Sequence, residues 1–249
     1  MIDIHTHVLP GIDDGADGLD TALDLLEQAA ASGVHTLVAT PHCNIPGEFD
    51  NYASGEMEEL FQRLNREKDR HHIPIKLCRG MEIYATENLP DLLKQGRVWT
   101  MNGTTYFLTE FAFDEDPGLC AHVLNACISL GFRPVVAHPE RYFFVQDDLQ
   151  IAYNWCTHGC ALQLNKGSIL GRFGSGPQRA ALRLLDHGLV ACVASDAHNP
   201  YHRTTYMTEV YQRLSALYDE DYADLLLEEN PARVLRGDSL LGFEPLPFD

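Results

Sequence analysis

The chain begins with the sequence Met1-Ile2-Asp3-Ile4-His5-Thr6-His7, and this stretch predicts both a strand and a site. Apolar and polar residues alternate along it, which is the two-residue period of a β-strand. Because side chains alternate along a strand, His5 and His7 point to the same side and can converge on one ion. Alone, the His-x-His pattern is a weak signal, since it also fits two ordinary histidines near an N-terminus.

The same pattern, an apolar run that ends on a His, Asp or Glu, recurs along the chain. Strands are expected over 34–40, 73–83, 105–110, 133–137, 161–165 and 189–195. Their ends carry potential metal ligands, which are His42, Glu82, Glu110, His138, Asp196 and His198. Asp14 lies in the loop directly after the first strand and can reach the same edge. One such residue is usually packed or solvated, but their repeated coincidence with strand ends indicates a metal site.

Amphipathic helices are expected between these strands. They cover 19–32, 56–70, 117–130, 146–158 and 177–187, with a short helix within 88–104. Apolar strands that alternate with amphipathic helices are typical of a parallel sheet covered on both faces. About seven such units predict a TIM-like (β/α)7 barrel, which brings the carboxyl ends of its strands together on one face. An open doubly wound sheet is the alternative, and it would bring fewer strand ends together. We expect a single domain over 1–249.

The charge of the chain narrows the choice of partners and metals. With 18 Lys+Arg against 36 Asp+Glu, the formal net charge is −18. This charge repels nucleic acid and anionic membranes, so we expect neither nucleic-acid binding nor membrane insertion. Mixed imidazole and carboxylate ligands suit zinc, manganese or iron rather than calcium. Bound cations would offset part of the negative charge.

Cysteine usage and the N-terminal sequence bear on location. The seven cysteines are an odd number without the density of a disulfide scaffold, so we expect reduced thiols. The N-terminus has no basic, apolar leader, and no stretch approaches a membrane span. We therefore expect a cytoplasmic protein, and the sequence leaves its oligomeric state open.

Several short motifs resemble those of the polymerase-and-histidinol-phosphatase (PHP) family. They are Asp3-Ile-His-Thr-His7, Asp13-Asp-Gly-Ala16, Thr40-Pro-His-Cys43, Gly80-Met-Glu82, Ala137-His-Pro-Glu-Arg141 and Ser195-Asp-Ala-His198. The resemblance is strongest to the bacterial protein-tyrosine phosphatase branch, associated with capsule and exopolysaccharide assembly. It implies a distorted (β/α)7 barrel with three divalent metal ions, commonly manganese. It also implies a phosphotyrosine protein as substrate, namely the tail of a bacterial tyrosine autokinase.

The resemblance further implies which residues hold each ion and the phosphate. One ion would be bound by His5, His7, Glu82 and Asp196. Glu82 would bridge to a second ion, bound also by Glu110 and His138. The third ion would be bound by Asp14, His42 and His198. Arg141 and Arg203 match the arginines that grip the phosphate in that branch.

This ligand set agrees with the chemistry of phosphomonoester hydrolysis. A bridged metal pair lowers the pKa of a bound water, supplies a bridging hydroxide for attack and clamps the entering and leaving oxygens. The third ion and two guanidiniums would neutralise the other phosphate oxygens, for which the forked donors of arginine are suited. A tyrosyl leaving group, with a pKa of about 10, needs little protonation. Asp14 or a water on the third ion would serve as the general acid.

Other functions stay open as alternatives. A small-molecule phosphatase, with histidinol phosphate as the obvious substrate, would use the same site. A non-catalytic metal-binding regulator is the alternative from another class. A nuclease is disfavoured by the acidic charge. An amidohydrolase often has a carboxylated lysine at a middle strand end, where this chain has Glu82 and Glu110.

The segment from Cys127 to Arg133 fits Cys-x5-Arg, the bare pattern of thiol-based tyrosine phosphatases. That chemistry needs a strand that leads into a phosphate-binding loop at a helix N-terminus. Here a helix is expected to end at Gly131, after which a strand begins. We therefore expect Cys127 in the core.

Four polar or aromatic residues lie near the motifs. Gln163 and Asn165 end a predicted strand, where they either line the pocket or satisfy local backbone groups. Tyr142 and Tyr201 flank the motifs at the predicted mouth, and we expect both to pack.

Overall fold

The computed structural model describes residues 1–242 and 244–248. Its strands are β1 (Ile2–Thr6), β2 (Thr36–Ala39), β3 (His42–Cys43), β4 (Lys76–Arg79), β5 (Glu82–Tyr84), β6 (Tyr106–Glu110), β7 (Arg133–Ala137), β8 (Ala161–Asn165) and β9 (Cys192–Ala194). Its α-helices are α1 (Leu19–Ala31), α2 (Gly55–Arg70), α3 (Leu89–Lys94), α4 (Pro117–Ser129), α5 (Phe143–Asp147), α6 (Gln150–Thr157), α7 (Lys166–Ile169), α8 (Ser175–Asp186), α9 (Thr208–Leu217), α10 (Glu220–Asp224) and α11 (Asn230–Arg236). The 3-10 helices η1 (Met101–Gly103) and η2 (Pro139–Arg141) and the π-helix η3 (Leu225–Glu229) complete the fold. Phe243 and Asp249, which belong to the expected domain, lie outside the described residues.

The strands form two parallel sheets, with the orders β1-β2-β4 and β3-β5-β6-β7-β8-β9. The single strand expected over 73–83 is divided between them, because β4 and β5 flank a bend at Gly80. A Cβ at Gly80 would lie 3.0 Å from Met101 Sδ and 3.1 Å from Val38 Cγ1, a close approach that favours glycine. Pro41 separates β2 from β3 in the same way, since proline has no amide hydrogen for a ladder.

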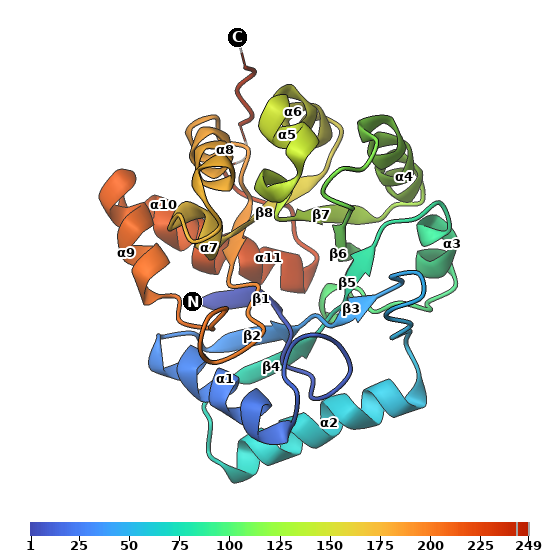
Figure 1. The fold of residues 1–249 in the computed structure, drawn as a ribbon, viewed down its shortest axis with the longest axis vertical. Helices are drawn as coiled ribbons and strands as arrows, with labels where there is room; N and C mark the ends of the chain where they lie inside the picture. The colour runs from blue at the N-terminus through green and yellow to red at the C-terminus, as the bar shows by residue number, and fades with distance from the viewer. Residues whose placement is uncertain (243, 249) are drawn as a thin grey trace.

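Main-chain hydrogen bonds connect the end of the last strand to the first. The Asp196 amide donates to the His5 carbonyl at 2.9 Å, and the His7 amide donates to the Ala197 carbonyl at 2.8 Å. The parallel strands therefore progress around a distorted barrel, with most helices around its outside and α11 across its middle in this view (Figure 1). This arrangement confirms the expected α/β architecture.

Apolar side chains fill both the interior of the barrel and the layer between strands and outer helices. Ile4 and Leu108 belong to the inner cluster, together with Val234 and Leu235 of α11. The Val234 carbonyl accepts a hydrogen bond from the Thr104 hydroxyl, just before β6. Helix α11 therefore covers the amino ends of the strands, and the site occupies their carboxyl ends.

The helix expected over 146–158 is two helices, α5 and α6. Asp148 interrupts it with extended backbone, φ −141° and ψ 95°. Its Oδ1 accepts a hydrogen bond from the Gln150 amide at 3.0 Å, an Asx turn that starts the second helix. None of the helices in 1–242 or 244–248 has the length and apolar character needed to cross a membrane.

Candidate metal centre

The predicted ligands meet at the carboxyl ends of the strands. They are His5, His7, Asp14, His42, Glu82, Glu110, His138, Asp196 and His198. Two of them have left-handed backbone that is unusual outside glycine, His138 with φ 36° and Asp196 with φ 50°. Such backbone costs about 1–3 kcal/mol per residue and is concentrated at functional sites. His138 follows directly after β7 and Asp196 is the second residue after β9, and both side chains enter the centre.

The first group consists of His5, His7, Glu82 and Asp196, all of which are buried. The Nε2 atoms of His5 and His7 lie 3.3 Å apart, which confirms that the two imidazoles converge. Each of these nitrogens lies 3.1 Å from Glu82 Oε2. Asp196 Oδ1 lies 3.5 Å from His5 Nε2 and 3.6 Å from His7 Nε2.

Glu82 links the first group to the second. Its Oε1 lies 2.8 Å from His138 Nε2, on the side away from His5 and His7. Glu110 Oε2 lies 3.7 Å from the same His138 nitrogen. The carboxylate of Glu82 therefore has ligand atoms on both sides, as a bridging ligand requires.

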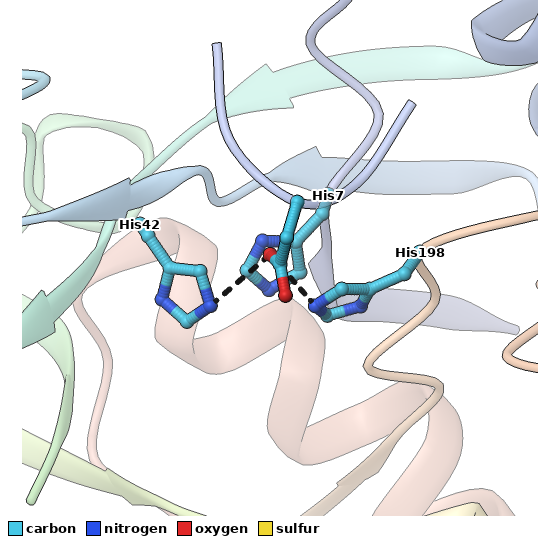
Figure 2. Close-up of side chains that lie close together, drawn as sticks. His7, His42 and His198 are labelled. Carbon is cyan, nitrogen blue, oxygen red and sulfur yellow. Dashed lines mark ion pairs between the residues drawn. The ribbon is translucent and has the colours of Figure 1, made fainter. Parts of the chain in front are cut away.

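The third group contains Asp14, His42 and His198, and His7 lies within the same group. Asp14 Oδ1 is 3.5 Å from His42 Nε2 and 3.3 Å from His198 Nε2. Figure 2 shows the rings of His7, His42 and His198 gathered around one point, with these two ion pairs dashed. His42 also reaches Glu110, whose Oε1 lies 2.9 Å from His42 Nδ1. The three groups thus share ligands more extensively than the resemblance implies.

The donor set fits divalent cations. Four buried atoms of these residues make no hydrogen bond within the described residues, namely His42 Nδ1, Asp196 Oδ1, His198 Nε2 and His138 Nδ1, and the first three face another candidate ligand. An unpaired buried polar atom costs about 1–3 kcal/mol, and a bound cation would satisfy the lone pairs of those three. Ligand atoms about 2.0–2.2 Å from one ion lie roughly 3 Å from each other, as most of these atoms do.

The electrostatics of the centre are dominated by its carboxylates. Burial disfavours the charged form of His42, but Glu82 and Glu110 outweigh that effect and raise the pKa of His42 to about 9. His198 lies farther from these two carboxylates, and burial together with His7 lowers the pKa of His198 to about 4. The carboxylate side of the centre therefore favours positive charge.

Three further side chains orient the ligands. His5 Nδ1 contacts Gln163 Oε1 at 2.8 Å, and His7 Nδ1 contacts Asp13 Oδ2 at 2.8 Å. Asn165 Nδ2 donates to Asp196 Oδ2 at 2.5 Å. Such outer contacts set the tautomer and orientation of a metal ligand. The side chains of Gln163 and Asn165 thus contact candidate ligands rather than local backbone groups. The role of Asp13 was missed in the sequence, although Asp13 lies inside one of the motifs.

Arg141 and Arg203 lie on the far side of Asp196. Arg203 Nη2 is 2.6 Å from Asp196 Oδ2, and Arg141 Nη1 is 3.3 Å from the same oxygen. The Arg141 guanidinium carbon also lies 4.8 Å from the ring centroids of both Phe113 and Phe173. The two predicted arginines are therefore next to each other and next to the ligand cluster.

Of the remaining sequence expectations, the structure confirms two and contradicts one. Cys127 is buried in α4, and burial raises the pKa of its thiol to about 12, which confirms its place in the core. Tyr142 packs as expected, and its hydroxyl donates to the Ala137 carbonyl at 2.8 Å. Tyr201 is 80% exposed, so the expectation that it packs was wrong. Its loop extends outward from the rim of the centre.

Comparison with known proteins places the chain in a family. Residues 1–236 match the family described as capsular polysaccharide synthesis, CpsB/CapC. The chain is 32% identical over 247 residues to tyrosine-protein phosphatase YwqE of Bacillus subtilis, covering 99% of this chain and 96% of that one. It is 30% identical over 241 residues to tyrosine-protein phosphatase CpsB of Streptococcus agalactiae, covering 95% and 98%.

A solved structure agrees with this assignment. It comes from the work on YwqE of Bacillus subtilis and CpsB of Streptococcus pneumoniae, which are described as unique metal-dependent tyrosine phosphatases. It superposes with a TM-score of 0.93 at 31% identity over 100% of both chains. These matches confirm the resemblance to the bacterial tyrosine phosphatase branch. The chain belongs to the CpsB/CapC family of capsular polysaccharide synthesis.

Proposed function

We propose that this protein is a metal-dependent protein-tyrosine phosphatase of capsule and exopolysaccharide synthesis. Asp196 carries the proposal, because its two carboxylate oxygens have different partners. Oδ1 lies 3.5 Å from His5 Nε2 in the ligand cluster, and Oδ2 lies 2.6 Å from Arg203 Nη2. A cation centre and an anion-binding arginine pair thus adjoin at one side chain. A phosphate monoester needs both at once.

We infer three divalent ions at this centre, with manganese as the expected metal. The residues that would hold them are His5, His7, Glu82 and Asp196 for one ion, Glu82, Glu110 and His138 for the second, and Asp14, His42 and His198 for the third. When bound, these ions would lower the pKa of coordinated water and neutralise charge on the phosphate oxygens.

The side chains around the ions have separate tasks. Arg141 and Arg203 would bind non-bridging phosphate oxygens through forked, charge-assisted hydrogen bonds. Glu82 and Asp196 are both 1% exposed, and the exclusion of bulk water strengthens such interactions. Against the effect of burial, His198 and His42 hold the pKa of Asp14 well below its usual range. Asp14 therefore suits metal binding better than proton donation.

The setting proposed for this activity follows from the relatives and the cysteines. The relatives are named tyrosine-protein phosphatases, and the family is that of capsular polysaccharide synthesis. This supports a phosphorylated tyrosine autokinase as the partner. All seven cysteines are free, which supports a cytoplasmic location. The barrel core and the site both draw on residues from β1 onward, which supports a single domain over 1–249.

Kinetics with matched substrates test this function. The metal-loaded protein should hydrolyse a phosphotyrosine peptide with a far higher kcat/KM than histidinol phosphate, and chelation should abolish turnover. Elemental analysis should find three ions per chain. His138→Ala should remove turnover because it takes away a ligand of the second ion.

Other outcomes would favour the alternative functions. A preference for histidinol phosphate would favour a small-molecule phosphatase, and no turnover with manganese would favour a non-catalytic metal-binding regulator. Full activity of the metal-stripped protein would contradict the metal role.

A further inference from the structure

A groove of about 830 Å³ opens beside Arg203, on the outer side of the ligand cluster. One wall is the segment after α7, with Arg172 and Phe173. The other wall is the loop from Pro200 to Tyr206, together with the first turn of α9 at Thr208 and Glu209. Both segments follow strands of the barrel at their carboxyl ends, so the groove lies on the same face as the centre. We call it the 172–208 groove.

The inner end of the 172–208 groove borders the phosphate-binding arginines. Arg203 lines the groove and pairs with Asp196. Phe173 lines it too, and its ring centroid lies 4.8 Å from the Arg141 guanidinium carbon. In a phosphotyrosine residue the aromatic ring separates the phosphate from the main chain. A phosphate held by the two arginines would therefore bring the flanking peptide residues to the rim, where the groove begins.

The lining of the groove has the chemistry of a peptide site. Tyr201 is 80% exposed and Tyr206 is 49% exposed, and both line it. Tyrosine and arginine are enriched at protein-binding surfaces, and a tyrosine ring gives a large contact area with few rotatable bonds. A volume of about 830 Å³ is within the range of sites that bury a ligand of many atoms.

The charge of the groove differs from that of the whole molecule. The chain carries −18, yet two arginines, Arg172 and Arg203, line the groove. Among its described lining residues, Glu209 has the single carboxylate, and Arg172 pairs with it. An acidic peptide side chain would compete with Glu209 for Arg172. On an acidic molecule this local positive charge selects for acidic partners.

We propose that the 172–208 groove binds the polypeptide that flanks the phosphotyrosine and favours acidic residues there. This inference rests on the proposed function and specifies its substrate. The groove thereby distinguishes a phosphoprotein from a small phosphate ester, which reaches only the two arginines and the metal centre.

Three substrates separate these effects in the manganese-loaded protein. They are p-nitrophenyl phosphate, a phosphotyrosine peptide with flanking glutamates, and the same peptide with flanking glutamines. Thr208→Trp narrows the groove and should lower the ratio of peptide to p-nitrophenyl phosphate kcat/KM about tenfold. Arg172→Gln should lower the ratio of glutamate to glutamine peptide about two- to fivefold, as for one exposed ion pair, and less at high salt.

The matched controls remove the same groups elsewhere. Thr157→Trp is the control for Thr208→Trp, because both threonines are exposed and the hydroxyl of each donates to a main-chain carbonyl. Arg179→Gln is the control for Arg172→Gln, because it removes an exposed arginine outside the groove. Both should leave the two ratios unchanged. If both ratios stay constant in Thr208→Trp and Arg172→Gln, the groove does not bind the flanking peptide, and the proposed phosphatase function is unaffected. If the unchanged protein hydrolyses none of the three substrates, both the proposed phosphatase function and the peptide-binding role of the groove are wrong.

Discussion

Asp13 holds His7 through a contact of 2.8 Å between its Oδ2 and the Nδ1 of the imidazole. A proton on Nδ1 leaves the Nε2 lone pair free, and Nε2 lies 3.1 Å from Glu82 Oε2. The same Asp13 oxygen accepts the His42 amide at 3.0 Å. One carboxylate therefore contacts both the ring of a candidate ligand just after β1 and the backbone of another on β3.

Asp13→Asn should weaken metal binding without removing a ligand. The amide keeps the shape of the side chain but loses the charge that stabilises the Nδ1 proton of His7. Loss of such a partner costs about 10–100-fold in metal affinity. Titration of the apoprotein with manganese against a competing chelator measures the change. Equal affinity in the variant and the unchanged protein would show that Asp13 has no role in ligand orientation.

The candidate ligands at strand ends could be predicted from the sequence because the order of elements in a barrel is regular. Apolar runs alternate with amphipathic helices, so parallel strands bring their last residues to one face. His138 and Asp196 could be found in this way, since each lies within two residues of the end of a buried strand. Identification of Arg203 needed the family resemblance, because it follows a loop and carries no strand-end signal.

Features that depend on distant contacts could not be predicted. The bend at Gly80 depends on Met101 and Val38, which no local pattern around Gly80 reveals. The loop that carries Arg203 is held by Lys166, whose buried ammonium donates to the Thr204 and Tyr206 carbonyls. Lysine is mostly exposed in proteins, so its sequence position suggests no such role.

Gly15→Ala should disrupt the loop that carries Asp14. A Cβ at Gly15 would lie 2.2 Å from the His7 carbonyl oxygen and 2.3 Å from His7 Cβ, so the backbone must move. We expect a loss of about 1–3 kcal/mol in the free energy of unfolding and weaker metal binding. Denaturant unfolding and metal titration measure both. Gly55→Ala is the matched control, because Gly55 is the first residue of α2 and nothing lies within 4 Å of its added Cβ. Two variants of equal stability and affinity would contradict this packing argument.

Arg203→Lys should lower kcat/KM for a phosphotyrosine peptide about 10–100-fold, the range for loss of a charge-assisted hydrogen bond. Arg203 donates from Nη2 to Asp196 Oδ2 and from Nε to the Asp196 carbonyl at 3.2 Å. A lysine ammonium cannot reach both acceptors and the phosphate with the same geometry. Steady-state kinetics measure the loss. Arg79→Lys, at an exposed pair with Glu58, is the control and should have no effect. Unchanged kinetics in Arg203→Lys would exclude a forked contact to phosphate.

Cys127→Ala should change how stability depends on pH. Burial raises the pKa of the Cys127 thiol to about 12 in the folded protein, whereas an unfolded thiol titrates near its ordinary value of about 8.5. The unfolded state therefore loses this proton first as the pH rises. The stability that the neutral thiol provides is complete below about pH 8.5 and is lost progressively up to about pH 12, by roughly 1.4 kcal/mol per pH unit.

The variant lacks this group, so its free energy of unfolding should fall less steeply above about pH 9. At pH 7.5 it should be about 1 kcal/mol less stable than the unchanged protein, because a small cavity replaces the sulfur. Urea unfolding in the presence of a reductant at pH values from 7.5 to 10 gives both curves. The gap between them should narrow as the pH rises. Parallel curves would show that the folded protein does not protect this thiol. The variant should also keep its turnover of p-nitrophenyl phosphate, because Cys127 is on α4 and buried in the hydrophobic core, away from the metal centre.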